Sequence, residues 1–191
     1  KLASQRSIQN TVAALGRNGM EAVVVGSGKE AKETALAFIP EGSEVMTMSS
    51  ITLDTIGLAE EINKPGSKFK SIRARLARMK HLGSVPSFAV GSVQAVTEEG
   101  QVLMASNTGS QLPAYAYGAE KAIWVVGAQK VVKNIDEGMR RIYEYCLVKE
   151  SERARRAYGV PGSAVNKILI DNKEVQPGRV KLILVKEKLG F

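Results

Sequence analysis

Three short polar segments hold the residue types that bind small anions. They are Gly26, Ser27 and Gly28; Thr47, Ser49 and Ser50; and Ser106, Asn107, Thr108, Gly109 and Ser110. The first two directly follow apolar runs. Backbone N–H groups and hydroxyls donate hydrogen bonds to phosphate or carboxylate oxygens. The sequence therefore predicts a site for a small anion, provided that the three segments come together in the fold.

Each segment also has a purely structural interpretation. The first is not a GxGxxG, because Ala31 stands where the third glycine would be, and it is not a P-loop, so it also suits a plain turn from strand to helix. Ser50 and Thr52 are typical helix caps, and residues 106–110 suit an ordinary loop. Convergence on one sheet edge would distinguish a binding site from three separate loops.

Few residues suit acid–base or nucleophilic chemistry. Glu98 and Glu99 are adjacent, so on extended backbone they point to opposite faces and at most one enters a site. Cys146 lies on an apolar helical stripe, which favours core packing over a nucleophile. His81, the single histidine, has no acidic residue nearby to orient it. With one cysteine, one histidine and no carboxylates at metal-binding spacing, we expect no metal and no cofactor.

Positive charge is concentrated in one stretch of a chain whose net charge is +8. Its cationic residues are Lys68, Lys70, Arg73, Arg75, Arg78 and Lys80, with Phe69, Ile72, Leu76 and Met79 between them. This spacing predicts an amphipathic basic helix over residues 68–82, which we interpret as a solvated face or a lid over an anionic ligand. Nucleic acid is a less favoured partner, because aromatic residues make up only 5% of the chain and no known nucleic-acid motif occurs.

Length and composition limit the class of protein. The 191 residues predict a single domain over 1–191, and 44% hydrophobic with 24% charged residues is typical of a folded soluble protein. No apolar run reaches the ~18 residues of a membrane-spanning helix. The single cysteine allows no intrachain disulfide and favours a reducing, cytoplasmic compartment. Because the chain starts at Lys1 rather than at methionine, we expect that a segment was trimmed.

Strand patterns alternate with helix patterns along the chain. Buried strands are predicted at 21–26, 44–48 and 121–127, with helices before Gly19, at 29–39, around 53–59 and from Asn134 to Cys146. Residues 88–97 and 101–106 form a hairpin pattern about the turn 98–100, and 167–170 and 180–185 are the last strands. The expected fold is α/β, with a mainly parallel sheet flanked by helices and with the hairpin and C-terminal strands as antiparallel additions.

Several motifs in order along the chain carry a resemblance to a known family. They are Gly91-Ser-Val-Gln-Ala-Val-Thr97, Glu98-Glu-Gly100, Ser106-Asn-Thr-Gly-Ser-Gln-Leu-Pro113, Trp124-Val-Val-Gly-Ala-Gln-Lys130, Glu152-Arg-Ala-Arg-Arg-Ala-Tyr-Gly159 and Leu189-Gly-Phe191. From Ser4 to its end the chain resembles the LUD-domain proteins associated with lactate utilisation. The resemblance implies a fold similar to the superfamily of ribose-phosphate isomerase, glucosamine-phosphate deaminase and CoA-transferases, whose members bind sugar phosphates, folates or acyl-CoA at the carboxyl edge of the sheet.

The resemblance also implies a catalytic candidate and a kind of partner. Thr97-Glu98-Glu99-Gly100 is similar to the Ser-Glu-Asn-Gly segment in which class I CoA-transferases carry a nucleophilic glutamate, which places Glu98 in that role; Glu99 departs from the pattern. Larger LUD proteins act beside iron–sulfur partners. This chain has no cysteine cluster, so any redox centre belongs to a partner.

Three functions remain open. The first is a small-anion-binding subunit or accessory protein, alone or as a homo-oligomer, for an organic acid, a phosphate or an acyl-CoA. The second is a transferase or isomerase that uses Glu98. The third is a nucleic-acid or partner-docking module that uses the basic stretch 68–80.

Overall fold

The strands form two sheets. The computed structural model describes residues 1–73, 75 and 83–191, and in these residues sheet A has six strands in the order β1-β10-β7-β4-β2-β3, all parallel to their neighbours. Their bounds are β1 (Glu21–Val25), β10 (Val180–Val185), β7 (Lys121–Gly127), β4 (Phe88–Gly91), β2 (Glu44–Thr47) and β3 (Lys70–Ser71). The predicted α/β class with a mainly parallel sheet is confirmed.

Sheet B is smaller and mixed. Its order is β8 (Val131–Val132), β5 (Ala95–Thr97), β6 (Val102–Ser106) and β9 (Lys167–Asp171). β6 pairs antiparallel with both β5 and β9, whereas β5 pairs parallel with β8. The predicted hairpin is therefore confirmed as β5 and β6, while residues 88–91 leave it to join sheet A as β4.

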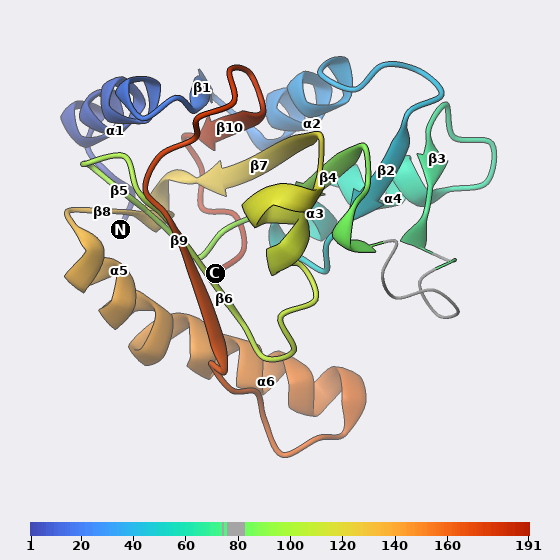
Figure 1. The fold of residues 1–191 in the computed structure, drawn as a ribbon. Helices are drawn as coiled ribbons and strands as arrows, with labels where there is room; N and C mark the ends of the chain where they lie inside the picture. Colours follow the sequence, from blue (N-terminus) through green and yellow to red (C-terminus); the bar gives the residue numbers. More distant parts are fainter. Residues whose placement is uncertain (74, 76–82) are drawn as a thin grey trace.

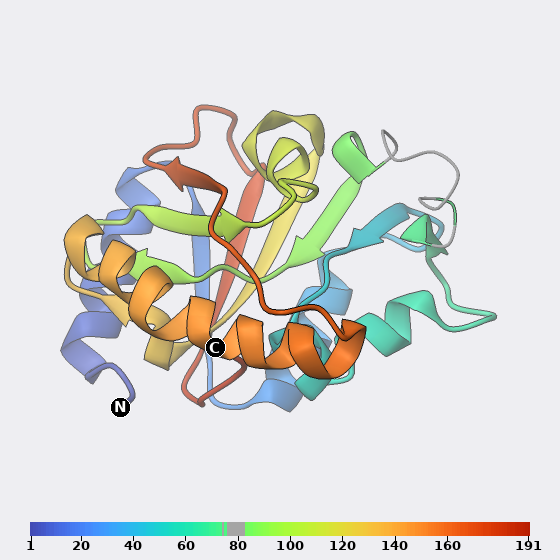
Figure 2. The same ribbon diagram turned by 90° about the horizontal axis from the view of Figure 1, so that it is seen from below.

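The molecule is layered (Figure 1). α2 (Gly28–Ala37), α3 (Ile51–Thr55) and α4 (Leu58–Asn63) cover one face of sheet A, and sheet B packs against the other. A long helical segment lies beyond sheet B and consists of α5 (Ile135–Arg141), the π-helical turn η5 (Ile142–Cys146) and α6 (Leu147–Tyr158). Figure 2 shows this segment crossing in front of the strands of sheet A. α1 (Gln5–Arg17) packs against β1 and β8.

The main core lies between the two sheets. Trp124 of β7 is fully buried there and meets Tyr115 edge to face, with ring centroids 5.5 Å apart. Tyr115 belongs to the short π-helix η3 (Ala114–Gly118), and η4 (Ala128–Lys130) is a 3-10 turn after β7. Cys146 is buried, as its apolar stripe predicts. Among the described residues, no helix has the length and apolar character needed to cross a membrane.

Helix starts follow the capping residues in the sequence. The Asn134 side chain accepts a hydrogen bond from the backbone N–H of Glu137, as its spacing predicts, and α5 begins there. Ser27 caps α2 in the same way. Ser50 is the N-cap residue of α3, as predicted, but its side chain makes no capping hydrogen bond.

Two strands differ from the predictions. The last strand, β10, is not an antiparallel addition but a parallel strand between β1 and β7. Its apolar residues are buried against both faces, which suits a central position. β1 instead lies at the sheet edge, and Val23 and Val24 remain 37% and 38% exposed, so the prediction of a strand covered on both faces is wrong there.

The basic stretch does not begin as a helix. Lys70 and Ser71 form β3, because the backbone N–H groups of Lys70 and Ile72 donate to Ser43 and Val45 along the open edge of β2. Phe69 and Ile72 are nevertheless buried, as predicted. Residues 74 and 76–82 of the predicted helix, which include Arg78, Lys80 and His81, lie outside the described residues.

Candidate functional site

A cavity of about 870 Å³ opens at the carboxyl ends of three neighbouring strands, β2, β4 and β7. Its wall comes from the segments that follow those strands, from the end of β6 and from α6. Parallel α/β sheets characteristically bind ligands at this edge, because loops after adjacent strands meet there. The cavity lies within the 300–1,000 Å³ or so that is usual for ligand sites.

Two of the three predicted polar segments meet at this cavity. Its lining includes Ser49, Ser50, Ser106, Asn107, Thr108 and Ser110. Thr47 lies directly below: it is fully buried and its hydroxyl accepts a hydrogen bond from Asn63 at 2.8 Å. Gly109 lies in the same loop, with its backbone N–H donating to the Ser106 hydroxyl at 2.8 Å. Side chains about 60 residues apart in sequence thus face one space.

The first predicted segment lies elsewhere. Three strands separate β1 from β2 in sheet A, so their ends are roughly 19 Å apart at the usual strand spacing. The backbone N–H of Gly26 donates to the Glu30 carboxylate at 3.0 Å, and that of Gly28 donates to Glu187 at 2.9 Å. The Ser27 hydroxyl donates to Glu30 as well. Carboxylates of the chain itself therefore occupy the donors that an external anion would need.

Glu98 also lies away from the cavity. It stands at the turn between β5 and β6, while the cavity is lined by Ser92, Val93 and Gln94, which precede β5 at its other end. The Glu98 carboxylate accepts a hydrogen bond from Asn10 of α1 at 3.1 Å, and its backbone N–H donates to Val132. The catalytic role of Glu98 remains a prediction that gains no support from this position.

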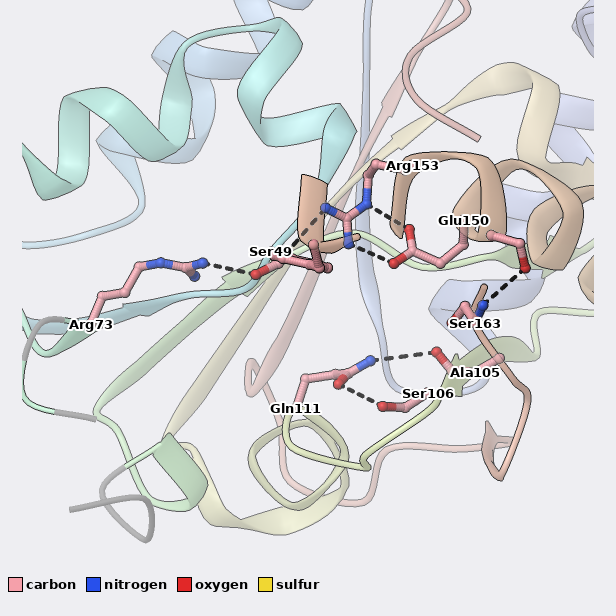
Figure 3. A network of polar contacts seen from close by, with 10 residues as sticks. Ser49, Arg73, Ala105, Ser106, Gln111, Glu150, Arg153 and Ser163 are labelled. Carbon is pink, nitrogen blue, oxygen red and sulfur yellow. Dashed lines mark hydrogen bonds and ion pairs between the residues drawn. The ribbon is translucent and has the colours of Figure 1, made fainter. Parts of the chain in front are cut away.

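Among the described residues, the guanidinium groups of Arg73 and Arg153 reach the cavity (Figure 3). Arg73 donates to the carbonyl of Thr47 at 2.5 Å and to the Ser49 hydroxyl at 2.8 Å, and Figure 3 shows it pointing toward Ser49. Arg153 of α6 is paired with Glu150 through two hydrogen bonds of 2.8 and 2.6 Å. Its charge is balanced within the chain, so Arg73 is the stronger candidate for an external anion. Asp54 and Glu60 are exposed residues of the lining.

The loop after β6 is held by its own hydrogen bonds. The Ser106 hydroxyl donates to Gln111 at 3.0 Å, and the Gln111 amide donates to the carbonyl of Ala105 (Figure 3). Lys167 of β9 supports the loop from outside by donating to the carbonyl of Thr108. Gly109 has a φ of +83°, a backbone angle that favours glycine, and a Cβ there would displace the Lys167 side chain, which would lie 2.5 Å away.

A buried lysine also lines the cavity. Lys130 in η4 is 2% exposed, and its Nζ lies 3.0 Å from the Thr52 hydroxyl and 2.9 Å from the Ser92 hydroxyl. Burial lowers the pKa of Lys130 to about 7; the positive charge of Arg141 adds to this, and Cys146 opposes it. A fraction of this amine is therefore neutral at neutral pH, which is unusual for lysine.

Tyr115 contributes a buried hydroxyl to the same lining. The residue is 1% exposed, and its hydroxyl has no hydrogen-bond partner among the described residues. Burial raises the pKa of Tyr115, so the phenol is a hydrogen-bond donor rather than a charged group. A Cβ at Gly91 would lie 1.7 Å from this hydroxyl, so the phenol packs directly on the glycine that ends β4.

A model of the LUD domain matches residues 8–185, nearly the whole chain. The chain belongs to the LUD-domain family. A crystal structure of a DUF162 family protein from Deinococcus radiodurans has the same fold, with a TM-score of 0.61 and 14% identity over 97% of this chain and 99% of that one. Ribose 5 phosphate isomerase A from Neisseria gonorrhoeae is more distant, with a TM-score of 0.38 and 21% identity over 56% of this chain and 54% of that one. A search of curated proteins gives no match.

The sequence predicts no site role for two cavity residues of this LUD-domain protein, Ser92 and Lys130. Ser92 and Lys130 each follow a strand of sheet A within three residues. Their position after a strand, which also marked Ser49 and Ser50, could therefore have identified them. Arg73 was predicted in a basic helix that could cover an anionic ligand, but it follows β3 and donates to Thr47 and Ser49. Among the described residues, no group of three or more His, Cys, Asp or Glu side chains is placed to hold a metal ion.

Proposed function

We propose that this LUD-domain protein binds a small organic anion in the cavity, as a subunit or accessory protein in the utilisation of lactate or a related organic acid. The observation that carries the proposal is the meeting of two hydroxyl-rich loops with the Arg73 guanidinium at one sheet edge. A redox step, where one is needed, belongs to an iron–sulfur partner, because the chain has a single cysteine.

The hydrogen bonds around Ser49 support an anionic ligand. Its hydroxyl oxygen accepts from Arg73, and in the described part of the chain its own proton has no acceptor. An anion beside Ser49 would receive that proton and a charge-assisted hydrogen bond from the guanidinium, the stronger kind of contact for a carboxylate or phosphate. Asp54 and Glu60 on the lining disfavour a ligand charged along its whole length, so we place one anionic end at Arg73.

The volume of the cavity bears on ligand size. About 870 Å³ is far more than a lactate ion fills, so there is room for a sugar phosphate or for part of an acyl-CoA beside the anionic group. The apolar part of the lining, which includes Ile142 and Val165, would contact the remainder of such a ligand.

Isothermal titration of the whole protein tests this function. L-lactate, inorganic phosphate, a sugar phosphate and acetyl-CoA are titrated separately into wild type, Arg73→Gln and Ser49→Ala. We expect saturable binding of at least one of them and a loss of tenfold or more in Arg73→Gln, since about 1.4 kcal/mol corresponds to tenfold. Arg17→Gln, an exposed arginine of α1 outside the cavity, is the matched control. Equal affinity in wild type and Arg73→Gln, or no binding of any of the four, would overturn the proposal.

A further inference from the structure

We propose that Ser92 and Lys130 form a nucleophile and base pair, and that the cavity is an acyl-transfer site for small esters or thioesters. This activity goes beyond anion binding. It is independent of Glu98 and uses two residues from the ends of neighbouring strands, β4 and β7.

The geometry is that of an activated nucleophile. Ser92 Oγ lies 2.9 Å from Lys130 Nζ, within hydrogen-bond reach. Ser92 is half-buried and Lys130 is buried, and both line the cavity, so a carbonyl group bound there can approach the hydroxyl. Serine with a lysine base is a known variant of the serine, histidine and aspartate arrangement.

A third group orients the base. Thr52 Oγ1 donates its proton to the carbonyl of Leu189 at 3.1 Å, so at 3.0 Å from Lys130 it must act as the acceptor. This contact commits one N–H of Lys130. In the neutral amine the lone pair of Lys130 Nζ is then directed toward Ser92 and can accept the hydroxyl proton of Ser92.

The surroundings of Lys130 favour the neutral amine. No carboxylate of the described residues pairs with it, and the charged or titratable groups that act on it are Arg141 of α5 and Cys146 of η5. Burial and Arg141 both lower the pKa of Lys130, to about 7. A general base works best when its pKa is close to the working pH.

Tyr115 packs on the strand that carries the proposed nucleophile. Its hydroxyl is buried and without a partner in the described part of the chain, and it packs on Gly91, the residue before Ser92. Because successive residues of a strand point to opposite faces, this contact fixes the backbone that precedes Ser92 and leaves the Ser92 side chain facing Lys130.

The proposed reaction transfers the acyl group first to Ser92 and then to water, which is the second substrate. The Ser92 proton moves to Lys130 Nζ while Oγ bonds to the carbonyl carbon, and the C–O or C–S bond to the leaving group then breaks as Lys130 returns the proton to the departing oxygen or sulfur. Water attacks the resulting acyl-Ser92, gives one proton to Lys130, and the carbon to Oγ bond breaks as Ser92 recovers a proton. The products are a carboxylic acid and an alcohol or thiol.

Acylation by p-nitrophenyl acetate tests the proposal. The whole protein is mixed with the ester, p-nitrophenol release is followed, and the acetylated residue is mapped by peptide mass spectrometry. We expect an acetyl group on Ser92, with acylation about a hundredfold slower in Ser92→Ala and unchanged in Ser7→Ala of α1. An acetyl group on other residues only, or an unchanged rate in Ser92→Ala, would overturn the proposal; the map of the wild type decides the matter even if a variant fails to fold.

The role of Lys130 has a separate readout. In wild type the acylation rate should rise with pH around a midpoint near 7, as the amine loses its proton. Lys130→Met, which keeps an unbranched chain but removes the amine, should abolish that rise. An identical pH profile in the variant would remove Lys130 as the base. Titration of the same variants with L-lactate and phosphate reports on anion binding separately, so either proposal can fail alone.

Discussion

The loop at Gly26–Gly28 and the loop at Ser49–Ser50 both follow a parallel strand of sheet A, yet only the second faces a cavity. The first ends β1, at the sheet edge, and its N–H groups are already bonded to Glu30 and Glu187. The second ends β2, beside β4, and retains a hydroxyl proton that nothing in the described chain accepts. Position at the carboxyl edge is therefore insufficient: a binding site also needs polar groups that the chain leaves unused.

The two regions also differ in what their packing allows. At the cavity, Gly91 lies under the Tyr115 hydroxyl, and both are fixed in the core between the sheets. At the first loop, the nearest neighbour of Gly26 is the flexible end of Glu30, 3.3 Å from where a Cβ would lie. A side chain at position 91 would therefore meet packed core groups, whereas one at position 26 would meet only the Glu30 carboxylate.

A pair of glycine substitutions gives the largest expected difference. Gly91→Ala should lower the free energy of unfolding by about 3 kcal/mol, because the new methyl group displaces a buried phenol. Gly26→Ala should change it by less than about 0.5 kcal/mol, because Glu30 can move aside. Urea denaturation of both variants measures this, and equal losses would contradict the contrast.

Lys130→Met should raise the free energy of unfolding at pH 7 by about 2 kcal/mol, since a buried cation without a carboxylate partner is costly. The pKa of Lys130 is about 7 when folded and 10.5 ordinarily, so between these values the unfolded state binds the extra proton. The stability of the wild type relative to this variant therefore increases as pH rises from 7 to about 10.

Denaturation at several pH values measures this difference. Lys29→Met, an exposed lysine of α2, should keep the pH slope of the wild type. If Lys130→Met and wild type showed the same slope, the buried amine would not be neutral in the folded protein.

The smallest expected effects come from one substitution at each of the two loops. Glu187→Gln should cost about 1 kcal/mol, because it weakens a charge-assisted bond to the N–H of Gly28, and it should leave anion affinity unchanged. Ser49→Ala should have the opposite pattern, with weaker anion binding and unchanged stability. Thermal denaturation and titration on the same samples check both, and a loss of affinity in Glu187→Gln would reverse our assignment of the two loops.

Much of the fold could be predicted from local pattern. The apolar run at Val180–Val185 gives β10 with its correct bounds, and the Asn134 cap places the start of α5. Strand neighbours could not be predicted, because an apolar run does not state which strand lies beside it. β3 was missed for the same reason: the helical spacing of Phe69 and Ile72 is local, whereas pairing with β2 is not.

The candidate site could be predicted only in part. Ser49, Ser50 and the loop 106–110 were found because their residue types and their places after strands were both informative. Lys130 was not, since a lysine after a strand normally points to solvent, and only the tertiary fold buries it between Thr52 and Ser92. Gly26–Gly28 was predicted on its pattern, which does not reveal that Glu187 occupies it.

The most direct test of the central claim is an amide chemical-shift titration of the ¹⁵N-labelled protein with L-lactate, repeated with inorganic phosphate. The account predicts saturable shifts at Ser49, Ser50, Thr108, Gly109 and Ser110, with Gly26, Ser27 and Gly28 unchanged. Saturable shifts confined to Gly26–Gly28, or none at the cavity with either anion, would contradict it.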